Sequence, residues 1–313
     1  TVVGRCDAIA IGIGREPIIA LVWIRWTRVG FRVWLPGILF RLWLIGHDGR
    51  VLAERRSAEG MTTAATTGFE AVLEGRLADL GVPATVPALA CGMVGARQGW
   101  VEAGYLDTPA RLSDIPAAAL RVPGIARDVR ILPGIARRDP AAPDVIRGEE
   151  TQILGALAAH GLQAATLCMP GTHSKWGRVA EGCLNAFSTF MTGELFAAVT
   201  GHTILTHAVA GAPADEDMEV FRQAVAAALA APARIANLLF QVRGGQLLFG
   251  RGAAAARETI SGSLIGLEIA GGHVADGGEL VLIAAGRLAR LYGEALGVAG
   301  LTHRVIDADA AVL

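Results

Sequence analysis

Two adjacent acids at residues 149 and 150 are the first side chains in this sequence that could do chemistry. They belong to the run Arg147-Gly148-Glu149-Glu150-Thr151-Gln152, which opens a segment with helical spacing. A carboxylate in the first turn of a helix is stabilised by the helix dipole and can accept a proton from a reacting hydroxyl. Acids are also ordinary capping residues at such a position. The pair therefore predicts either a general base or a helix cap.

A second candidate site follows a predicted strand at residues 165–169. The run Pro170-Gly171-Thr172-His173-Ser174-Lys175-Trp176 holds a glycine, three hydrogen-bonding side chains and the only lysine of the chain. Backbone amides in such a turn, together with an ammonium group, suit phosphate oxygens. The run differs from the GxxxxGK[ST] phosphate loop, because no four residues separate two glycines and no helix pattern follows. A solvated β-turn is the alternative interpretation.

Two further runs carry groups suited to a sugar acid. In the first, which covers residues 95–100, Arg97 can bind a carboxylate through two parallel hydrogen bonds, and Gln98 and Trp100 stand beside it. In the second, which covers residues 189–196, the polar residues Thr192 and Glu194 enter an apolar helix. The alternatives are a surface loop with one packed tryptophan for the first run, and a helix cap followed by core residues for the second.

The elements that would position these residues alternate between strands and helices, which predicts an α/β fold. The order of hairpin, helix and strand occurs once in each half of the chain. Irregular structure is expected over residues 106–146. We expect hairpins at 40–57 and 176–187, strands at 86–91, 165–169 and 279–284, and helices at 63–80, 149–160, 217–230, 233–240, 253–267 and 286–296.

Composition limits the class of protein. The chain has 313 residues, of which 52% are hydrophobic and 18% charged, so it can bury large cores and form two domains. A formal net charge of -1 without a long basic run argues against a nucleic-acid partner and favours a small molecule. The cysteines lack CxxC spacing, and arginines interrupt the most apolar stretch, residues 17–46. We expect reduced thiols, no membrane partner and a cytoplasmic location.

Four runs in order give the chain a family resemblance: GMVGARQGWVEAGY (92–105), PDVIRGEETQILG (143–155), PGTHSKW (170–176) and FMTGELF (190–196). Together they resemble the signature blocks of the 2-keto-3-deoxygalactonokinases, over a span from about Phe40 to the C-terminus. That family belongs to the acetate and sugar kinase, Hsc70 and actin superfamily. The resemblance therefore implies two RNase-H-like, actin-like ATPase lobes with an inter-lobe active-site cleft, and we place the division between residues 1–150 and 151–313.

The resemblance also implies ATP with Mg²⁺ and the phosphorylation of 2-keto-3-deoxygalactonate to 2-keto-3-deoxy-6-phosphogalactonate. By analogy with exopolyphosphatases of the same superfamily, Glu150 or Glu149 is the expected base. The expected contacts to the ATP phosphates are Gly171, Thr172, His173 and Ser174, with Lys175 balancing their charge. The expected contacts to the sugar acid are Arg97, Gln98, Trp100, Thr192 and Glu194.

The first residues depart from the family pattern. Kinases of this superfamily open with a strand that ends in an Asp-x-Gly-Thr loop, whose carboxylate organises Mg²⁺. Here the corresponding positions fall on residues 34–39, with Trp34 in place of the aspartate, and tryptophan cannot bind magnesium. The residues that would bind the metal are therefore unknown. Our hypothesis is that residues 1 to about 39 are not the natural sequence, since the other blocks are intact.

Other functions are compatible with the same motifs. The alternatives are a kinase for another keto-deoxy sugar acid, a phosphate-chain hydrolase, and a non-catalytic nucleotide-binding relative, because a shared fold does not fix the substrate. ADP release against a panel of keto-deoxy acids would separate them. The sequence also leaves the oligomeric state open between a monomer and a homodimer.

Overall fold

The computed structural model describes residues 19–24, 40–46, 48–57, 61–213, 217–272 and 278–312, with backbone only at 19–24 and 61–62. These residues divide into two compact units. The described part of the first unit ends at Gly161, and the second unit begins at Leu162. Residues 34–39, where the sequence places the loop with Trp34, lie outside the described residues.

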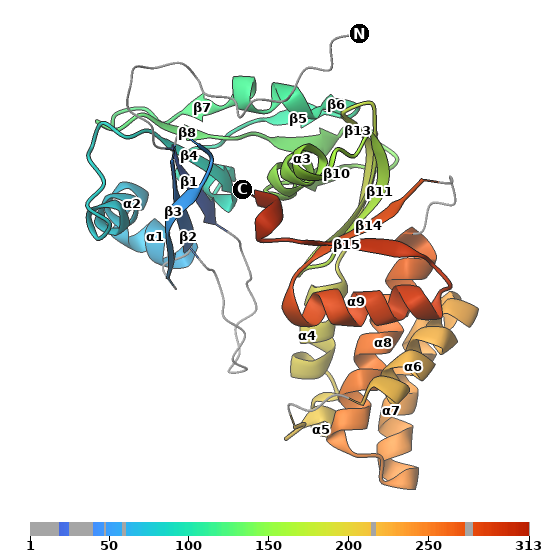
Figure 1. The fold of residues 1–313 in the computed structure, drawn as a ribbon. Coiled ribbons are helices and arrows are strands. Elements are labelled where there is room, and N and C mark those ends of the chain that lie inside the picture. The colour runs from blue at the N-terminus through green and yellow to red at the C-terminus, as the bar shows by residue number, and fades with distance from the viewer. Residues whose placement is uncertain are drawn as a thin grey trace. The chain divides into compact units, whose positions relative to one another are not determined.

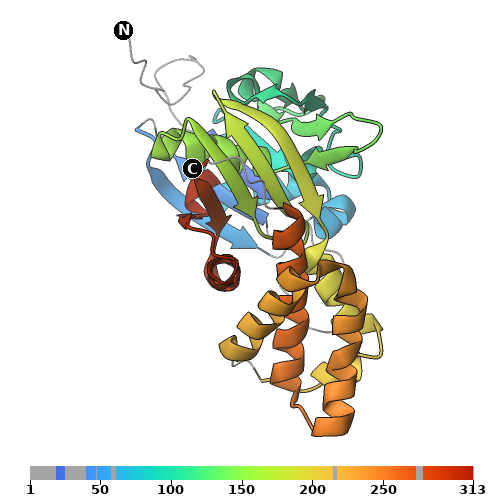
Figure 2. The same cartoon turned by 90° about the vertical axis from the view of Figure 1, so that its right-hand side faces the viewer.

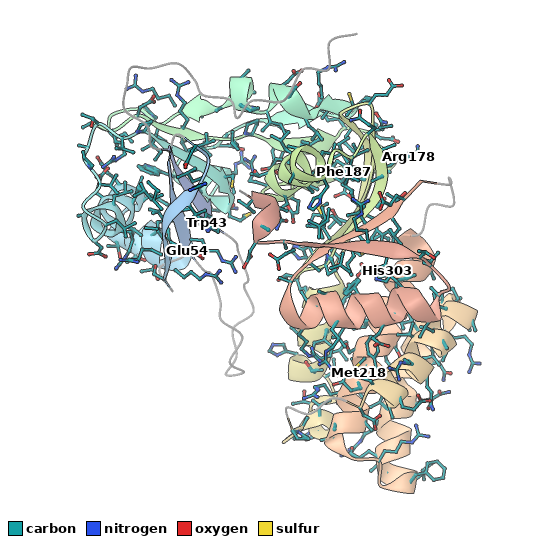
Figure 3. The ribbon with its side chains drawn as sticks, viewed as in Figure 1. Trp43, Glu54, Arg178, Phe187, Met218 and His303 are labelled. Atoms are coloured by element: carbon teal, nitrogen blue, oxygen red, sulfur yellow. The ribbon has the colours of Figure 1, made fainter. Side chains whose placement is uncertain are left out.

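The first unit is built on a mixed sheet with the strand order β3-β2-β1-β4-β8-β7. β1 pairs antiparallel with β2 and parallel with β4, and β2 pairs antiparallel with β3. In Figure 3, Trp43 on β2 and Glu54 on β3 mark two residues that face each other in this register. The strands are β1 (Ile19–Ile24), β2 (Phe40–Ile45), β3 (Val51–Ser57), β4 (Ala88–Gly92), β7 (Leu120–Arg121) and β8 (Val129–Ile131).

Helices and short strands complete the first unit. α1 (Met61–Thr67) and α2 (Phe69–Ala78) form where one helix was expected, because Gly68 between them has a φ of 99°. The turn after β4 forms η1 (Met93–Gly95). The region expected to be irregular, residues 106–146, instead holds short elements: β7 and β8 and, in addition, β5 (Tyr105–Asp107), β6 (Ala110–Arg111), η2 (Leu112–Asp114), η3 (Pro116–Ala118), β9 (Gly134–Arg137) and β10 (Asp144–Ile146). The last element is α3 (Glu149–His160).

The second unit repeats the same sheet topology. Its strands lie in the order β15-β14-β11-β12-β13, antiparallel from β13 to β11 and parallel from β11 to β15. Figure 1 shows them from yellow-green to red, and Arg178 and Phe187 in Figure 3 mark β12 and β13. They are β11 (Ala164–Met169), β12 (Ser174–Ala180), β13 (Cys183–Phe190), β14 (Leu280–Ala284) and β15 (His303–Asp307).

Helices make up most of the rest of the second unit. α6 packs along α8, and α7 runs beside α8, as Figures 1 and 2 both show. They are α4 (Thr192–His202), α5 (Thr206–Val209), α6 (Met218–Ala230), η4 (Pro232–Arg234), α7 (Ile235–Phe249), α8 (Ala253–Gly272), α9 (Gly286–Val298) and η5 (Ala310–Val312). α7 and α8 both extend beyond the bounds expected from sequence.

The shared strand order confirms the predicted α/β class with two RNase-H-like units. In each unit a three-stranded antiparallel meander is followed, after intervening helices, by two parallel strands. The boundary between the units lies after Gly161 and not at the expected position 150/151. A boundary at 150/151 would cut through the first turn of α3. The structure keeps this helix whole within the first unit.

None of the described helices alone is long and apolar enough to cross a bilayer. Only the pair formed by Met218–Ala230 and Pro232–Phe249 meets the criteria of length and composition, and this pair is bent by 110°.

Close packing of α6 on α8 depends on glycine. A Cβ atom added at Gly262 of α8 would lie 2.5 Å from the Phe221 carbonyl oxygen of α6, which is far inside van der Waals contact. At Gly244 of α7, by contrast, an added Cβ would meet no atom of the described structure within 4 Å. Helix packing therefore requires glycine at position 262 but not at position 244.

We predict opposite effects for the same substitution at these two glycines. Gly262→Ala forces α6 and α8 apart and should lower the free energy of unfolding by about 1–3 kcal/mol. Gly244→Ala, the matched control, should raise it by up to about 1 kcal/mol, because alanine favours the helix. Urea denaturation followed by circular dichroism measures both. Equal effects of the two substitutions would contradict the packing argument.

Candidate active site

The start of α3 places one of the two predicted acids in the interior of the first unit. The chain enters the helix through Gly148, whose φ of 107° is a conformation that favours glycine. Glu150 is fully buried, and Glu149 is half-buried. The Gly148 amide donates to Glu150 Oε2 at 2.6 Å, whereas Thr151 Oγ1 lies 3.4 Å from Oε1. Oε1 therefore has the weaker partner of the two oxygens.

The surroundings of Glu150 raise its proton affinity. Burial, followed by the charge of Glu149, raises the pKa of Glu150 from 4.5 to about 7, against the opposing effects of backbone amides and Arg147. A carboxylate with this pKa exchanges a proton near neutral pH, as a general base must. Of the two acids that the sequence leaves open, Glu150 has the properties of a base.

The loop after β4 holds the residues expected to bind a sugar acid. Gly99 allows its tight turn, since an added Cβ would lie 2.2 Å from the Val94 carbonyl oxygen. Trp100 stacks on Phe69 with ring centroids 6.1 Å apart and packs against the core. Arg97 and Gln98 are exposed, so their polar groups are accessible to a ligand. Trp100 is therefore at least in part a packed structural residue, which is the alternative that the sequence left open for this loop.

Arg147 is a residue of this region that the sequence analysis did not single out. Its Nη2 donates to the Ala103 carbonyl oxygen at 2.6 Å, and its guanidinium lies 4.3 Å from the centre of the Tyr105 ring. Arg147 therefore links the loop after β4 to the segment that leads into α3. Nε and Nη1 are buried and have no hydrogen-bond partner among the described residues. The sequence signal that could have identified Arg147 is its position directly before Gly148 and the acid pair.

In the second unit, the predicted phosphate turn lies between β11 and β12. Gly171, Thr172 and His173 are partly exposed at its tip. The Glu194 amide donates to the Thr172 carbonyl oxygen at 3.0 Å, and an added Cβ at Gly193 would lie 2.5 Å from the Gly171 oxygen. The N-terminus of α4 is therefore packed directly on the turn, where its free amides favour an anion.

Three other predicted site residues have side chains directed into the protein. Ser174 is fully buried and bonds to the Tyr292 hydroxyl at 3.0 Å. Lys175 is 5% exposed, and its Nζ donates to the His173 carbonyl oxygen at 2.7 Å. Thr192 is 8% exposed and hydrogen-bonds to a buried acid of α8, Glu268. The lysine thus places its charge beneath the turn rather than at its surface.

The structure groups the predicted residues into two sets. The acid pair and the loop of Arg97, Gln98 and Trp100 belong to the first unit. The phosphate turn belongs to the second, together with Thr192 and Glu194, which the sequence analysis had assigned to the sugar acid. Glu194 forms an ion pair with His173 of the turn. For these two residues a contact to the sugar stays a prediction, whereas their link to the turn is a feature of the structure.

The described residues contain no group of three or more His, Cys, Asp or Glu side chains arranged to hold a metal ion. Mg²⁺ in phosphate-transfer sites is bound by phosphate oxygens, water and one or two carboxylates, so a protein cage is not required. The carboxylate that the family would supply falls in residues 34–39, outside the described structure. We therefore assign the metal to no residue.

The repeated topology, with a glycine turn after the first strand of the second unit, defines the class as a protein of two RNase-H-like units, the actin-like ATPase fold. Comparisons with known proteins give the family. A family model for 2-keto-3-deoxy-galactonokinase matches residues 38–313, so the chain belongs to that family. The four motif blocks identified in the sequence all lie within the match.

Individual relatives agree with this assignment. A probable 2-dehydro-3-deoxygalactonokinase of Rhizobium meliloti is 55% identical over 276 residues, which cover 87% of this chain and 90% of the relative. The 2-dehydro-3-deoxygalactonokinase of Escherichia coli is 33% identical over the same shares of both chains. A crystal structure from Sinorhizobium meliloti that carries the same kinase name superposes with a TM-score of 0.86 at 52% identity, covering 94% of this chain and 95% of that one.

The raised pKa of Glu150 predicts a pH-dependent stability. Between about pH 4.5 and 7 the folded state holds this proton more tightly than the unfolded state, so the free energy of unfolding falls as pH rises. The contribution is at most about 1.4 kcal/mol per pH unit. Glu150→Gln removes the titration, and its stability relative to the wild type should therefore increase with pH over this range.

Denaturation midpoints at several pH values measure this difference. Glu149→Gln serves as the control, because it keeps the buried acid and removes only the neighbouring charge that helps to raise its pKa. The fall in stability should persist in this variant with a smaller amplitude. A difference between Glu150→Gln and the wild type that does not change with pH would show that Glu150 does not titrate in this range.

Proposed function

We propose that the chain is an ATP-dependent kinase that phosphorylates 2-keto-3-deoxygalactonate to 2-keto-3-deoxy-6-phosphogalactonate, in galactonate catabolism. The observation that carries the proposal is the family match over residues 38–313, and the buried Glu150 at the start of α3 is the proposed base. Family membership over residues 38–313 and the names of the relatives support the substrate. The free thiols of Cys91, Cys168 and Cys183 are compatible with the reducing cytoplasm.

In the proposed reaction, the hydroxyl of the sugar acid attacks the γ-phosphorus of ATP. A new O–P bond forms, the bond from the γ-phosphorus to the bridging oxygen breaks, and ADP leaves. Glu150 takes the proton of the attacking hydroxyl, and Oε1 is the oxygen with the longer hydrogen bond. With a pKa near the working pH, a substantial fraction of the base is deprotonated, and this form still binds a proton strongly. A general base needs both properties.

The turn between β11 and β12 is the proposed phosphate site. Gly171, Thr172 and His173 would bind the phosphate oxygens through the exposed tip of the turn. The N-terminus of α4 and the buried ammonium of Lys175 add positive potential from behind. Lys175 and Ser174 are proposed to support the turn rather than to contact ATP, since both side chains have internal partners. We propose Mg²⁺ as the counter-ion that accompanies ATP.

The exposed part of the loop after β4 is the proposed carboxylate site. Arg97 presents a guanidinium that matches a carboxylate in two hydrogen bonds, and Gln98 beside it is equally accessible. Trp100 holds the loop in place through its stacking on Phe69. Thr192 and Glu194 are proposed to act at the phosphate turn, and the hydrogen bond from the Glu194 amide to the Thr172 carbonyl oxygen supports this proposal.

The first test of the proposal is the rate of ADP release with 2-keto-3-deoxygalactonate as the acceptor. Glu150→Gln should lower kcat by about 10² to 10⁴, the usual effect of losing a general base, whereas Glu149→Gln should have a much smaller effect. In the wild type, kcat/KM should decline as pH falls below about 7, because protonated Glu150 cannot accept a proton. If both variants keep near-normal rates, Glu150 is not the base, and Asp144 becomes the candidate.

The N-terminal hypothesis gains support from the start of the family match. The match begins at residue 38, so most of the unusual stretch lies outside it. We propose that the natural enzyme carries an Asp-x-Gly-Thr loop where this chain has residues 34–39. Peptide mass spectrometry of the enzyme purified by activity from its source should then recover no peptide matching residues 17–37. Recovery of these peptides from fully active enzyme would refute the hypothesis.

A further inference from the structure

A buried carboxylate lies behind the proposed phosphate turn. Glu268, on α8, is 1% exposed. Within the described part of the chain, no basic side chain forms an ion pair with it. Its partners are uncharged donors instead: Trp176 Nε1 lies 2.9 Å from Oε1, and the Tyr292 hydroxyl lies 2.6 Å from Oε2. Burial raises the pKa of Glu268, and hydrogen bonds from Thr192, Tyr292, Trp176 and Ser174 oppose that rise.

The partners of Glu268 come from separate elements of the second unit. Ser174 and Trp176 lie on β12, Thr192 is the first residue of α4, and Tyr292 belongs to α9. The four donors are themselves almost fully buried. A single carboxylate on α8 therefore joins the sheet to two further helices in a place that water does not reach.

Two of these donors flank the proposed phosphate turn. Ser174 directly follows Gly171–His173 along the chain. Thr192 directly precedes Gly193, whose backbone packs against Gly171 and Thr172. Because Glu268 binds both Ser174 and Thr192, it holds the strand that leaves the turn and the helix that packs on the turn in one fixed arrangement.

We infer that Glu268 is a positioning residue for nucleotide binding: through Ser174 and Thr192 it fixes the turn at Gly171–His173 against the N-terminus of α4. This inference rests on the proposed function. Glu268 does not contact ATP itself. Its role is to keep the backbone amides of the turn and of α4 aimed at the phosphates before ATP arrives, so that binding requires no reorganisation.

The chemistry of the partners explains why a carboxylate is needed. The Trp176 indole can only donate, so Oε1 must remain an acceptor. The Tyr292 hydroxyl, 2.6 Å from Oε2, donates to the carboxylate, and an N–H in place of Oε2 would force this hydroxyl to turn and accept instead. Glu268→Gln keeps the volume and introduces an N–H that faces donors, which disturbs the arrangement without creating a cavity.

The test measures ADP affinity by calorimetry together with steady-state kinetics on the full-length chain. Glu268→Gln should weaken ADP binding and raise the KM for ATP by about tenfold or more, the equivalent of one lost charge-assisted hydrogen bond. The KM for the sugar acid should change by less than about twofold. Tyr292→Phe, which keeps the carboxylate and its own hydrogen bond to Ser174 but removes the hydroxyl that bonds to both, should have a smaller effect in the same direction.

Gly262→Ala is the matched control, because it disturbs α8 where the helix meets α6 rather than at Glu268. It should lower stability and leave the KM for ATP unchanged. Equal ADP affinity of the wild type and Glu268→Gln, both shown to be folded by circular dichroism, would overturn the inference. If Glu268→Gln does not fold, Tyr292→Phe decides by the same criterion.

The two proposals can fail separately. A wild-type chain that binds ADP but releases none from ATP with the sugar acid contradicts the proposed function, and the calorimetric comparison still tests Glu268. Normal turnover combined with unchanged nucleotide affinity in Glu268→Gln and Tyr292→Phe overturns the role of Glu268 alone. A chain that binds no nucleotide even with an Asp-x-Gly-Thr loop restored at residues 34–39 overturns both.

Discussion

The hydrogen bonding of the Glu268 carboxylate is the constraint on which the second unit depends. Moving a carboxylate out of water costs several kcal/mol, and within the described structure no cation offsets this cost. Donors from β12, α4 and α9 must therefore converge on one point of α8. Hydrogen bonds to a charged group contribute about 1.5–3 kcal/mol each, so several are sufficient, provided that none is missing. Two of these donors, Ser174 and Thr192, flank the proposed phosphate turn.

Glu150 in the first unit is the opposite case. It is as deeply buried, but its main hydrogen bonds come from backbone amides, that of Gly148 among them, and Glu149 adds a repulsive charge. A carboxylate left under-compensated in this way holds a proton near neutral pH. The protein therefore contains two buried acids with different consequences. Glu268 accepts hydrogen bonds from several buried side chains, whereas Glu150 keeps one oxygen with a weak partner.

The sequence was most informative where signals were local. The hairpin around Asp48-Gly49, the strand before the phosphate turn, and α3 with its glycine entry and acid pair were all predicted close to their observed bounds. The break at Gly68 and the short strands within residues 106–146 were not, because such strands depend on partners distant in the chain. Glu268 and Tyr292 were missed for the same reason: on a helix they look like ordinary polar residues, and only folding brings them to Ser174. Lys175 was recognised by its uniqueness, but its burial could not be inferred from type and spacing.

The repeated topology gives the unusual N-terminal stretch a structural meaning. In the second unit, the first strand β11 leads through the turn at residues 170–173 into its antiparallel neighbour β12. In the first unit, β1 and β2 have the same relation, and the connection between them is residues 25–39. The segment that lacks the expected Asp-x-Gly-Thr pattern is therefore the topological counterpart of the proposed phosphate turn. For this reason the identity of residues 1–39 bears directly on whether the chain, as its sequence stands, can bind ATP with a metal ion.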